Sequence, residues 1–449
     1  MPDPSPPVLP SGLPSSFSHA EAPPPLRARL AGLLPNERPA VAAGFLLFFC
    51  LFAGYFMLRP VRETMGITGG VQHLQWLFTA TFVVMLVAVP IYGAFAARVR
   101  RARLVPWLYA AFMVQLAAFA GAFFVAADSV VLARVFYVWV SVYNLFVVSV
   151  AWSFLADVCQ PGQARRLFGP IAAGASVGGL VGPVLGGLLV RTIGFSGLLL
   201  LSAMLLGASL ACVAYLLGWR TRHGAAADGE PDNPARPLGG SSWAGFVSVL
   251  RSPYLLGISA FVILLATAST FLYFEQARLV AEQFPDRVRQ AEIFSTIDAV
   301  VQALTILIQL GVTGRLAQRF GVRMLLAAIP LAIALGFVAL AVMPIFSVLV
   351  IVMIVRRVGE YALIRPGREM LFTVVDAETK YKAKNVIDTA VYRAGDAVSG
   401  WAKAGIDALG AGAGPAALVG AALALVWAGF GIGLGRAYGK RLPADTPDA

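Results

Sequence analysis

Long apolar runs separated by short polar segments dominate the hydrophobic pattern along this chain of 449 residues. An α-helix needs about 20 mostly apolar residues to cross a bilayer. We find twelve runs of roughly this length and expect each to form one transmembrane helix. The runs cover residues 41–66, 74–97, 104–126, 130–156, 167–190, 194–218, 254–278, 291–313, 324–344, 346–374, 385–408 and 414–436.

A polar stretch at 219–252 divides these runs into two sets of six. Its sequence is rich in Gly, Pro and charged residues, as is typical of a linker. The predicted fold class is an all-α membrane protein with twelve transmembrane helices in two six-helix repeats. The predicted parts are a disordered cytoplasmic tail (1–38), an N-terminal six-helix half (39–218), a cytoplasmic linker (219–252), a C-terminal six-helix half (253–437) and a cytoplasmic tail (438–449).

The distribution of Lys and Arg predicts how the helices are oriented. With the N-terminus in the cytoplasm, the cytoplasmic segments contain 22 basic residues, and the outer loops contain only Arg191, Arg287 and Arg289. Basic residues accumulate in cytoplasmic loops of membrane proteins. We therefore expect a multi-pass protein of a bacterial inner membrane with both termini in the cytoplasm.

Composition narrows the partners of the chain. Hydrophobic residues make up 59% of it and charged residues 13%, whereas a soluble domain is about one quarter charged. The net charge of +12 would suggest nucleic acid in a soluble protein, but most of these charges lie in short loops. We expect a monomer that contacts the lipid bilayer and a small anionic solute, and no nucleic acid.

The motifs of the common enzyme and metal sites do not occur in the sequence. The three Cys and three His residues show no metal-ligand spacing and no pairing pattern. No GxxxxGK[ST], GxSxG or HExxH occurs, so we expect no ATP hydrolysis, no catalytic residues, no metal and no cofactor.

Ten basic residues fall inside the apolar runs, and each costs about 2.5–3.5 kcal/mol to place at the centre of a bilayer. So many charges predict a water-filled, positively charged cavity. Arg forks suit phosphate or carboxylate, and the rings of Trp139, Tyr143 and Tyr273 are candidates to stack on a planar group. The ten residues are Arg59, Arg62, Arg134, Arg278, Arg356, Arg357, Arg365, Arg368, Arg393 and Lys403.

The first and seventh runs each end in a cluster of charges. Arg59 and Arg62 are three residues apart and so share one helix face, with Glu63 beside them. Glu275 has the i, i+3 spacing to pair with Arg278. We predict that the arginines and Glu275 bind substrate and that Glu63 and Glu275 are candidates for ion coupling.

The tenth run has the highest density of charges. Arg356 and Glu360 have the i, i+4 spacing of an ion pair, and Pro366-Gly367 should break the helix. The other predicted substrate-binding residues are Asn144, Arg365, Arg368 and Arg393, and the other coupling candidates are Asp298 and Glu360.

Repeats and two motifs connect the chain to a known superfamily. An offset of about 219 residues places Arg59 on Arg278 and Arg165 on Lys384, and parallel six-helix repeats are the design of major facilitator transporters. The segment with Gly314, Arg319, Gly321 and Arg323 resembles that superfamily's GxxxDRxGRR loop. Gly169, Gly178, Gly182, Pro183, Gly186 and Gly187 match its antiporter-associated fifth-helix motif, and we expect both motifs to serve conformational change.

Three further blocks resemble the nucleotide transporters of the ATP/ADP translocase type. They are residues 55–63 (YFMLRPVRE), 273–275 (YFE) and 365–388, which begins RPGREM and ends KAKNVID. The resemblance implies that Arg62 and Arg368 stand where this family has substrate-contacting Lys residues, and Glu275 where it has an essential Glu. The acid of the family's fourth helix has no counterpart here.

Together these observations predict a secondary active transporter of an organic anion, a phosphorylated metabolite or nucleotide, that works by alternating access. Two other functions stay open: a proton-coupled major facilitator exporter of drugs or metabolites, and a lipid flippase. We expect Arg62, Glu275 and Arg368 to line one cavity between the halves.

Overall fold

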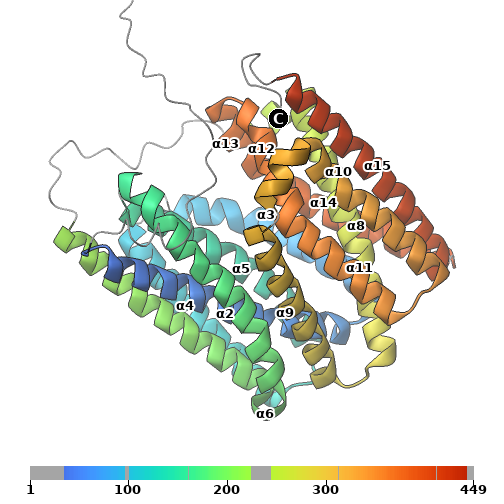
Figure 1. Cartoon of the computed structure of the whole chain (residues 1–449). Coiled ribbons are helices and arrows are strands. Elements are labelled where there is room, and N and C mark those ends of the chain that lie inside the picture. The colour runs from blue at the N-terminus through green and yellow to red at the C-terminus, as the bar shows by residue number, and fades with distance from the viewer. Residues whose placement is uncertain are drawn as a thin grey trace, which may run out of the picture.

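The computed structural model describes residues 35–96, 101–159, 161–223, 244–311, 313–410 and 412–441, which form helices and connecting turns (Figure 1). The long helices are α2 (Arg38–Thr68), α3 (Leu74–Ala96), α4 (Arg101–Val125), α5 (Val130–Val158), α6 (Pro161–His223), α8 (Pro253–Gln283), α9 (Arg287–Gly311), α10 (Thr313–Val342) and α15 (Ala413–Gly439). The shorter ones are α7 (Ala244–Arg251), α11 (Phe346–Gly359), α12 (Arg365–Leu371), α13 (Ala377–Val386), α14 (Tyr392–Ala408), the 3₁₀ turns η1 (Val71–His73) and η3 (Phe372–Val374), and the π turns η2 (Glu360–Ile364) and η4 (Ile387–Val391).

The all-helical membrane class is confirmed. Within the described residues, nine helices are long and apolar enough to cross a membrane. One of them, α6, contains two predicted spans, because Gly194 interrupts it with a φ of 64° that favours glycine. The predicted spans 346–374 and 385–408 are divided by π turns into shorter helices. The number twelve therefore stays a prediction.

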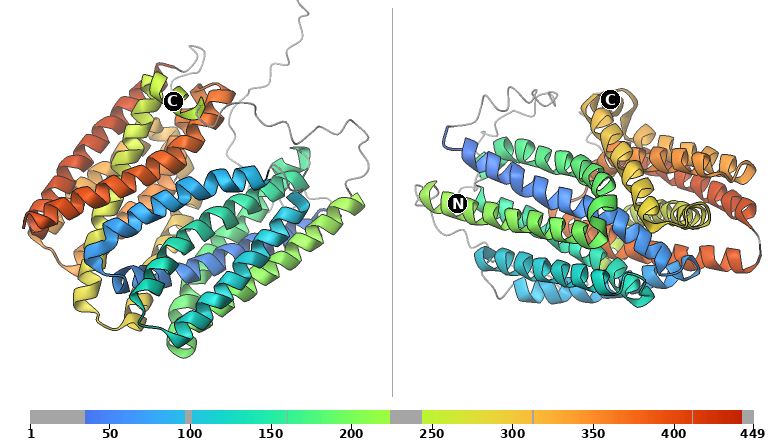
Figure 2. Two further views of the ribbon diagram at one scale, coloured as in Figure 1. Left: turned by 180° about the vertical axis from the view of Figure 1, so that it is seen from behind. Right: turned by 90° about the horizontal axis from the view of Figure 1, so that it is seen from below.

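The helices form two groups, each with its own hydrophobic core. Figure 2 shows α2 to α6 (blue to green) side by side and α8 to α15 (yellow to red) side by side. The first core includes Phe48, Phe136 and Tyr143, and the second includes Phe261 and Trp427, whose ring centroids are 5.6 Å apart. Because each group buries its own apolar side chains, the polar residues between the groups are left to form a site.

Glycines of the predicted fifth-helix motif bring α6 against α2. A Cβ at Gly178 would lie 2.4 Å from the carbonyl oxygen of Phe49, and one at Gly182 would lie 2.5 Å from that of Ala53. Only glycine permits backbones to approach this closely. Another motif glycine, Gly187, turns to the second group, where its Cβ would meet Ser295 of α9 at 3.1 Å. Pro183 and Gly169 also lie within α6, which thus packs between α2 and α9.

The second predicted motif is helical and not a loop. Gly314 and Arg319 lie in the first turns of α10, and the helix breaks at Gly321, whose φ is 66°. A Cβ on Gly435 of α15 would lie 2.6 Å from the Cα of Arg323. The glycine break and the close packing of α15 together fix the direction of α10 after the motif.

The predicted break at Pro366-Gly367 occurs one turn earlier, as η2. Proline has no N–H, so the carbonyl of Ala362 lacks its usual helical donor. The hydroxyl of Thr313 donates to that carbonyl at 3.0 Å, and the amide of Gln309 donates to the carbonyl of Tyr361 at 3.1 Å. Side chains from α9 and α10 therefore stabilise the distorted turn.

The predicted span 385–408 begins earlier than expected, with α13. Asp376 caps α13 by accepting a hydrogen bond from the backbone N–H of Thr379 at 2.8 Å. The same hydrogen bonding holds the pKa of the Asp376 carboxyl below its ordinary value.

Part of the predicted linker is also helical. The second leg of α6 continues to His223, and α7 buries Val249 and packs against α13, where a Cβ on Gly245 would lie 2.7 Å from the carbonyl oxygen of Lys382. The rest of the predicted linker (224–243), most of the predicted tails (1–34 and 442–449) and four residues of the first basic loop (97–100) lie outside the described residues.

The contact of α6 with α2 predicts the effect of adding one methyl group. Gly178→Ala should destabilise the protein by about 1–3 kcal/mol, because the new Cβ meets backbone atoms that cannot yield. Gly121→Ala is the control, since nothing lies within 4 Å of its Cβ, and it should stabilise α4 by about 0.5–1 kcal/mol. Thermal unfolding in detergent measures both, and equal effects would contradict the packing role of Gly178.

Candidate functional site: an arginine-rich cavity between the helix groups

A cavity of about 580 Å³ lies between the two groups of helices. Its lining comes from α2, α3, α5 and α6 on one side and from α8, α9, α11, η2, α12 and α14 on the other. The charged lining residues are six arginines (Arg59, Arg62, Arg356, Arg357, Arg365 and Arg393) and three acids (Glu63, Asp298 and Asp396). The described lining therefore carries three positive charges in excess.

The predicted polar cavity thus accounts for six of the ten basic residues in the apolar runs. The other four have partners elsewhere. Arg134 donates to the carbonyl of Gly69 at 2.9 Å, and Lys403 pairs with Asp407 at 2.5 Å. Arg278 and Arg368 pair with acids outside the cavity. These ten charges therefore lie at membrane depth either against a polar cavity or beside a partner.

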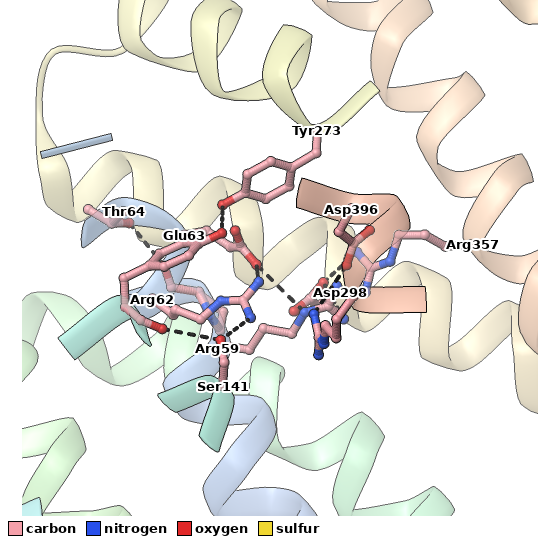
Figure 3. A network of polar contacts seen from close by, with 12 residues as sticks. Arg59, Arg62, Glu63, Thr64, Ser141, Tyr273, Asp298, Arg357 and Asp396 are labelled. Atoms are coloured by element: carbon pink, nitrogen blue, oxygen red, sulfur yellow. Dashed lines mark hydrogen bonds and ion pairs between the residues drawn. The ribbon is translucent and has the colours of Figure 1, made fainter. Parts of the chain in front are cut away.

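A chain of ion pairs crosses the cavity from the first helix group to the second (Figure 3). Glu63 Oε1 lies 2.8 Å from Arg62 Nη2 and 3.8 Å from Arg59 Nε. Asp298 Oδ1 lies 3.6 Å from Arg59 Nη1 and 2.5 Å from Arg357 Nη1. Three guanidinium groups share two carboxylates, so the chain keeps one uncompensated positive charge.

Aromatic rings hold the end of this chain at Arg62. Its guanidinium carbon is 4.9 Å from the ring centroid of Tyr137, and its Nη1 donates to Ser141 Oγ at 3.3 Å. The hydroxyl of Tyr137 donates to that of Tyr273 at 3.0 Å, so α5 of the first group contacts α8 of the second. This arrangement presents a flat ring and a cation side by side.

The second group supplies the other arginines. Arg356 pairs with Glu360 at 2.9 Å, as its spacing predicted, and donates to Ser269 Oγ at 2.6 Å. Arg393 pairs with Asp396 at 3.2 Å. The guanidinium carbon of Arg365 lies 5.2 Å from the ring centroid of Tyr361. These side chains line the cavity from the second helix group.

Three residues predicted to bind substrate, Glu275, Arg278 and Arg368, lie away from the cavity, so Arg62, Glu275 and Arg368 do not line it together in this structure. The lining residues of α8 recur at helical spacing (Ser269, Thr270, Tyr273 and Gln276), which places Glu275 on another face. There it pairs with Arg278 and borders a small void beside Lys403. Arg368 pairs with Asp388 at 2.9 Å.

The aromatic predictions divide in the same way. Tyr273 lines the cavity, and so does the predicted Asn144. Trp139 and Tyr143 belong to the first core instead, with ring centroids 6.0 and 5.2 Å from that of Phe112. A helix in a bundle buries aromatic residues on several faces, and only contacts with neighbouring helices decide which of them borders a cavity.

Sequence reasoning missed three charged lining residues, Arg356, Asp396 and Arg357, and the most deeply buried of them is Arg357. It is 3% exposed, and its Nε and Nη2 atoms have no hydrogen-bond partner. The available signal was the Arg356-Arg357 pair inside an apolar run, with the single acid Glu360 within one turn of both. One acid cannot compensate two arginines, but the sequence does not tell which arginine it leaves free.

Contacts at one end of the bundle join the two groups. Arg191 and Arg289 both bind the carboxylate of Glu292, and Arg289 Nη1 lies 3.0 Å from it. Arg287 donates to Asp128 Oδ1 at 2.5 Å and to the carbonyl of Ala127 at 2.7 Å. Arg287, Arg289 and Glu292 lie in the first two turns of α9, so these contacts hold α9 to the turn after α4 and to α6 near its break at Gly194.

Membrane-spanning helices in two groups, with a charged cavity between them, define a membrane transport protein. The family model of the Major Facilitator Superfamily matches residues 44–364. The chain belongs to the Major Facilitator Superfamily.

Known proteins similar to this chain agree with that membership. The chain is 24% identical over 405 residues to ADP,ATP carrier protein 1 of Chlamydia muridarum. The aligned region covers 82% of this chain and 69% of the carrier. Its fold is similar to a bacterial homologue of the human lysosomal transporter Spinster, with a TM-score of 0.62, 16% identity, and 92% and 100% of the two chains covered. It is also similar to the nucleoside transporter NupG, with a TM-score of 0.54, 15% identity, and 91% and 99% covered.

The surplus of arginine predicts that anions stabilise the protein. Pyrophosphate should raise the unfolding temperature more than chloride at equal ionic strength, because a ligand of the folded state stabilises it. Arg357→Gln should lose most of this increase, since truncating one member of a buried charged pair weakens binding by about 2–5 kcal/mol. Arg220→Gln removes the same charge from an exposed position and should keep the increase in unfolding temperature. An equal loss in both variants would locate the effect outside the cavity.

Proposed function

We propose that this protein is a secondary active transporter that exchanges phosphorylated organic anions with a planar ring, and that nucleotides are its substrate class. The observation that carries the proposal is the excess of positive charge in the cavity lining, three by its lining residues and still two when Glu360, which binds Arg356 at 2.9 Å, is included. A buried surplus of guanidinium groups is unfavourable unless an anion compensates it. Arg forks bind phosphate through two parallel hydrogen bonds, which adds geometric specificity to the attraction.

The aromatic rings beside the arginines are consistent with the planar ring of the proposed substrate. Phe56, Tyr137, Tyr273, Tyr361 and Tyr392 line the same cavity, and aromatic faces accept a nucleobase by offset stacking. The volume of about 580 Å³ lies within the range of small-molecule sites, about 300–1,000 Å³. The similarity to an ADP,ATP carrier points to the same class of cargo.

Alternating access is the mechanism that we propose for the exchange. With the N-terminus in the cytoplasm, residues 126–129, 191–194 and 284–287 lie on the outer side, where Arg191–Glu292 and Arg287–Asp128 join the groups. This conformation is then closed to the outside. Opening would require both pairs to separate while the groups move apart around the cavity.

The alternatives are less compatible with this cavity. A proton-coupled exporter of cationic compounds would place its substrate against six arginines and three acids, which is electrostatically unfavourable. In a lipid flippase we would expect the basic cluster to line an opening towards the bilayer. The apolar groove formed by α3, α4 and α5, lined by Val83, Val87 and Phe146, has no basic side chain among its described lining residues.

Exchange in proteoliposomes tests the proposed substrate class. Vesicles loaded with ADP should take up labelled ATP, and nucleotides should compete better than glucose 6-phosphate or malate. Arg62→Gln should slow exchange roughly tenfold or more, since it removes a charge-assisted contact at the cavity. Arg220→Gln is the surface control. Proton-driven uptake of tetraphenylphosphonium, without transport of any of these anions, would contradict the proposal.

The ion pairs at the start of α9 predict how access is controlled. Glu292→Gln leaves Arg191 and Arg289 without their carboxylate, so the cavity should open more often to the outside. The labelling rate of Ala175→Cys in the cavity by an impermeant thiol reagent should rise roughly twofold to fivefold, because such partly exposed pairs contribute about 0.2–1 kcal/mol.

The chain itself provides a low background and a matched control for the thiol-labelling measurement. Cys50, Cys159 and Cys212 are buried, so the parent protein should react slowly. Glu282→Gln removes a carboxylate that pairs with Arg278 of its own helix and should not change the rate. Equal labelling in the Glu292 and Glu282 variants would exclude the proposed closure.

A further inference from the structure

One carboxylate oxygen of Asp298 forms ion pairs with arginines of both helix groups. Its Oδ1 contacts Arg357 of α11 at 2.5 Å and Arg59 of α2 at 3.6 Å. Figure 3 shows its side chain between those two guanidinium groups. Asp298 is 3% exposed, and its second oxygen, Oδ2, has no hydrogen-bond partner. A carboxylate that anchored a fixed structural pair would be expected to use both oxygens.

The arginine partners of Asp298 are also incompletely used. Arg357 engages Asp298 through Nη1, and its Nε and Nη2 atoms have no partner. Unsatisfied donors on a buried cation are unfavourable, and a ligand with two anionic oxygens would satisfy them. The other ion pair of Arg59, with Glu63, is longer, at 3.8 Å. A ligand with several anionic oxygens could therefore form more hydrogen bonds with these two arginines than Asp298 does.

We infer that Asp298 is a resident counter-anion: it holds Arg59 and Arg357 in the empty transporter, and the anionic group of the substrate replaces it at the same two guanidinium groups. This inference rests on the proposed function, since it requires an anionic substrate. It adds the location of the anionic subsite and the residue that competes for it. Binding then costs the separation of Asp298 from two arginines and gains bidentate contacts with phosphate.

The position of the pair explains why replacement would matter for transport. Asp298 and Arg357 belong to the second helix group and Arg59 to the first, so Asp298 bridges the groups when no substrate is bound. The bridge neutralises the arginines during the return of the empty transporter. Without it, the return would place uncompensated charges in a closed cavity. Asp298 should therefore weaken substrate binding and at the same time permit net movement of substrate in one direction.

Binding of pyrophosphate and ADP to purified protein, measured by calorimetry, tests this competition. Asp298→Asn should lower the dissociation constant for both anions roughly tenfold, as expected when a close charge pair no longer has to be broken. Asp298→Glu keeps the competing carboxylate and should stay within about threefold of the parent. Thermal unfolding confirms that each variant is folded, and a folded Asp298→Glu with parental affinity supports the role of the charge.

Asp396→Asn is the matched control. Asp396 is a buried carboxylate of the same cavity that pairs with Arg393 of its own helix and accepts from Thr270, so it does not bridge the groups. An equal gain in affinity for Asp396→Asn would mean that only net charge matters and would overturn the inference. Weaker binding by Asp298→Asn would also overturn it, because Asp298 would then be a positioning residue.

Transport separates this inference from the proposed function. In proteoliposomes, the parent should also show net uptake of ADP into empty vesicles. Asp298→Asn should lower this net uptake far more than ATP/ADP exchange, because only net uptake requires the empty transporter to return. Exchange and net uptake that fall together would exclude the bridge. Absence of anion binding in the parent and in all variants would overturn the proposed function as well, whereas parental binding without a gain in Asp298→Asn overturns only the role of Asp298.

Discussion

The burial of guanidinium groups at membrane depth is the constraint on which the rest of this structure depends. A charge in a bilayer must be paired, hydrated or directed to the interface. Six arginines meet this requirement by facing one cavity between two helix groups, together with three acids. Glu63 and Asp298 are shared among Arg59, Arg62 and Arg357 and do not neutralise them completely. Incomplete compensation keeps the site receptive to an anion without leaving each arginine alone.

The irregular parts of the helices serve the same cavity. The π turn at Glu360–Ile364 lies beside Arg356, Arg357 and Arg365, and polar side chains of neighbouring helices satisfy its free carbonyl groups. π turns inside α-helices are frequent at functional sites. The glycines of α6 act differently, since they bring α6 against α2 and α9 and so keep the two helix groups in close contact. The π turn therefore positions the arginines of the cavity, and the close glycine contacts of α6 limit how the two helix groups can move.

The sequence contained enough to predict the class of the fold. Apolar runs of membrane length, a repeated pattern of charges and the glycine motif predicted an all-helical chain of the major facilitator type, and the structure and the family match confirm it. The helix ends were less predictable, because Asp376, Gly194 and the side chains near Pro366 act through local hydrogen bonds and packing. Five of the eight residues predicted to bind substrate, Arg59, Arg62, Asn144, Arg365 and Arg393, line the cavity, and their role in binding stays a prediction.

By itself, the sequence determined that lipid surrounds this protein and that its interior is basic, because composition and helix periodicity depend only on residues close along the chain. Tertiary structure decided which charges meet. Glu275 and Arg368 lie outside the cavity because of the faces that α8 and α12 present to their neighbours. Arg357 and Asp298 meet across 59 residues of chain, and no local spacing encodes such a contact. Pairing between distant helices follows from packing of the whole bundle, and this pairing defines the subsite that we assign.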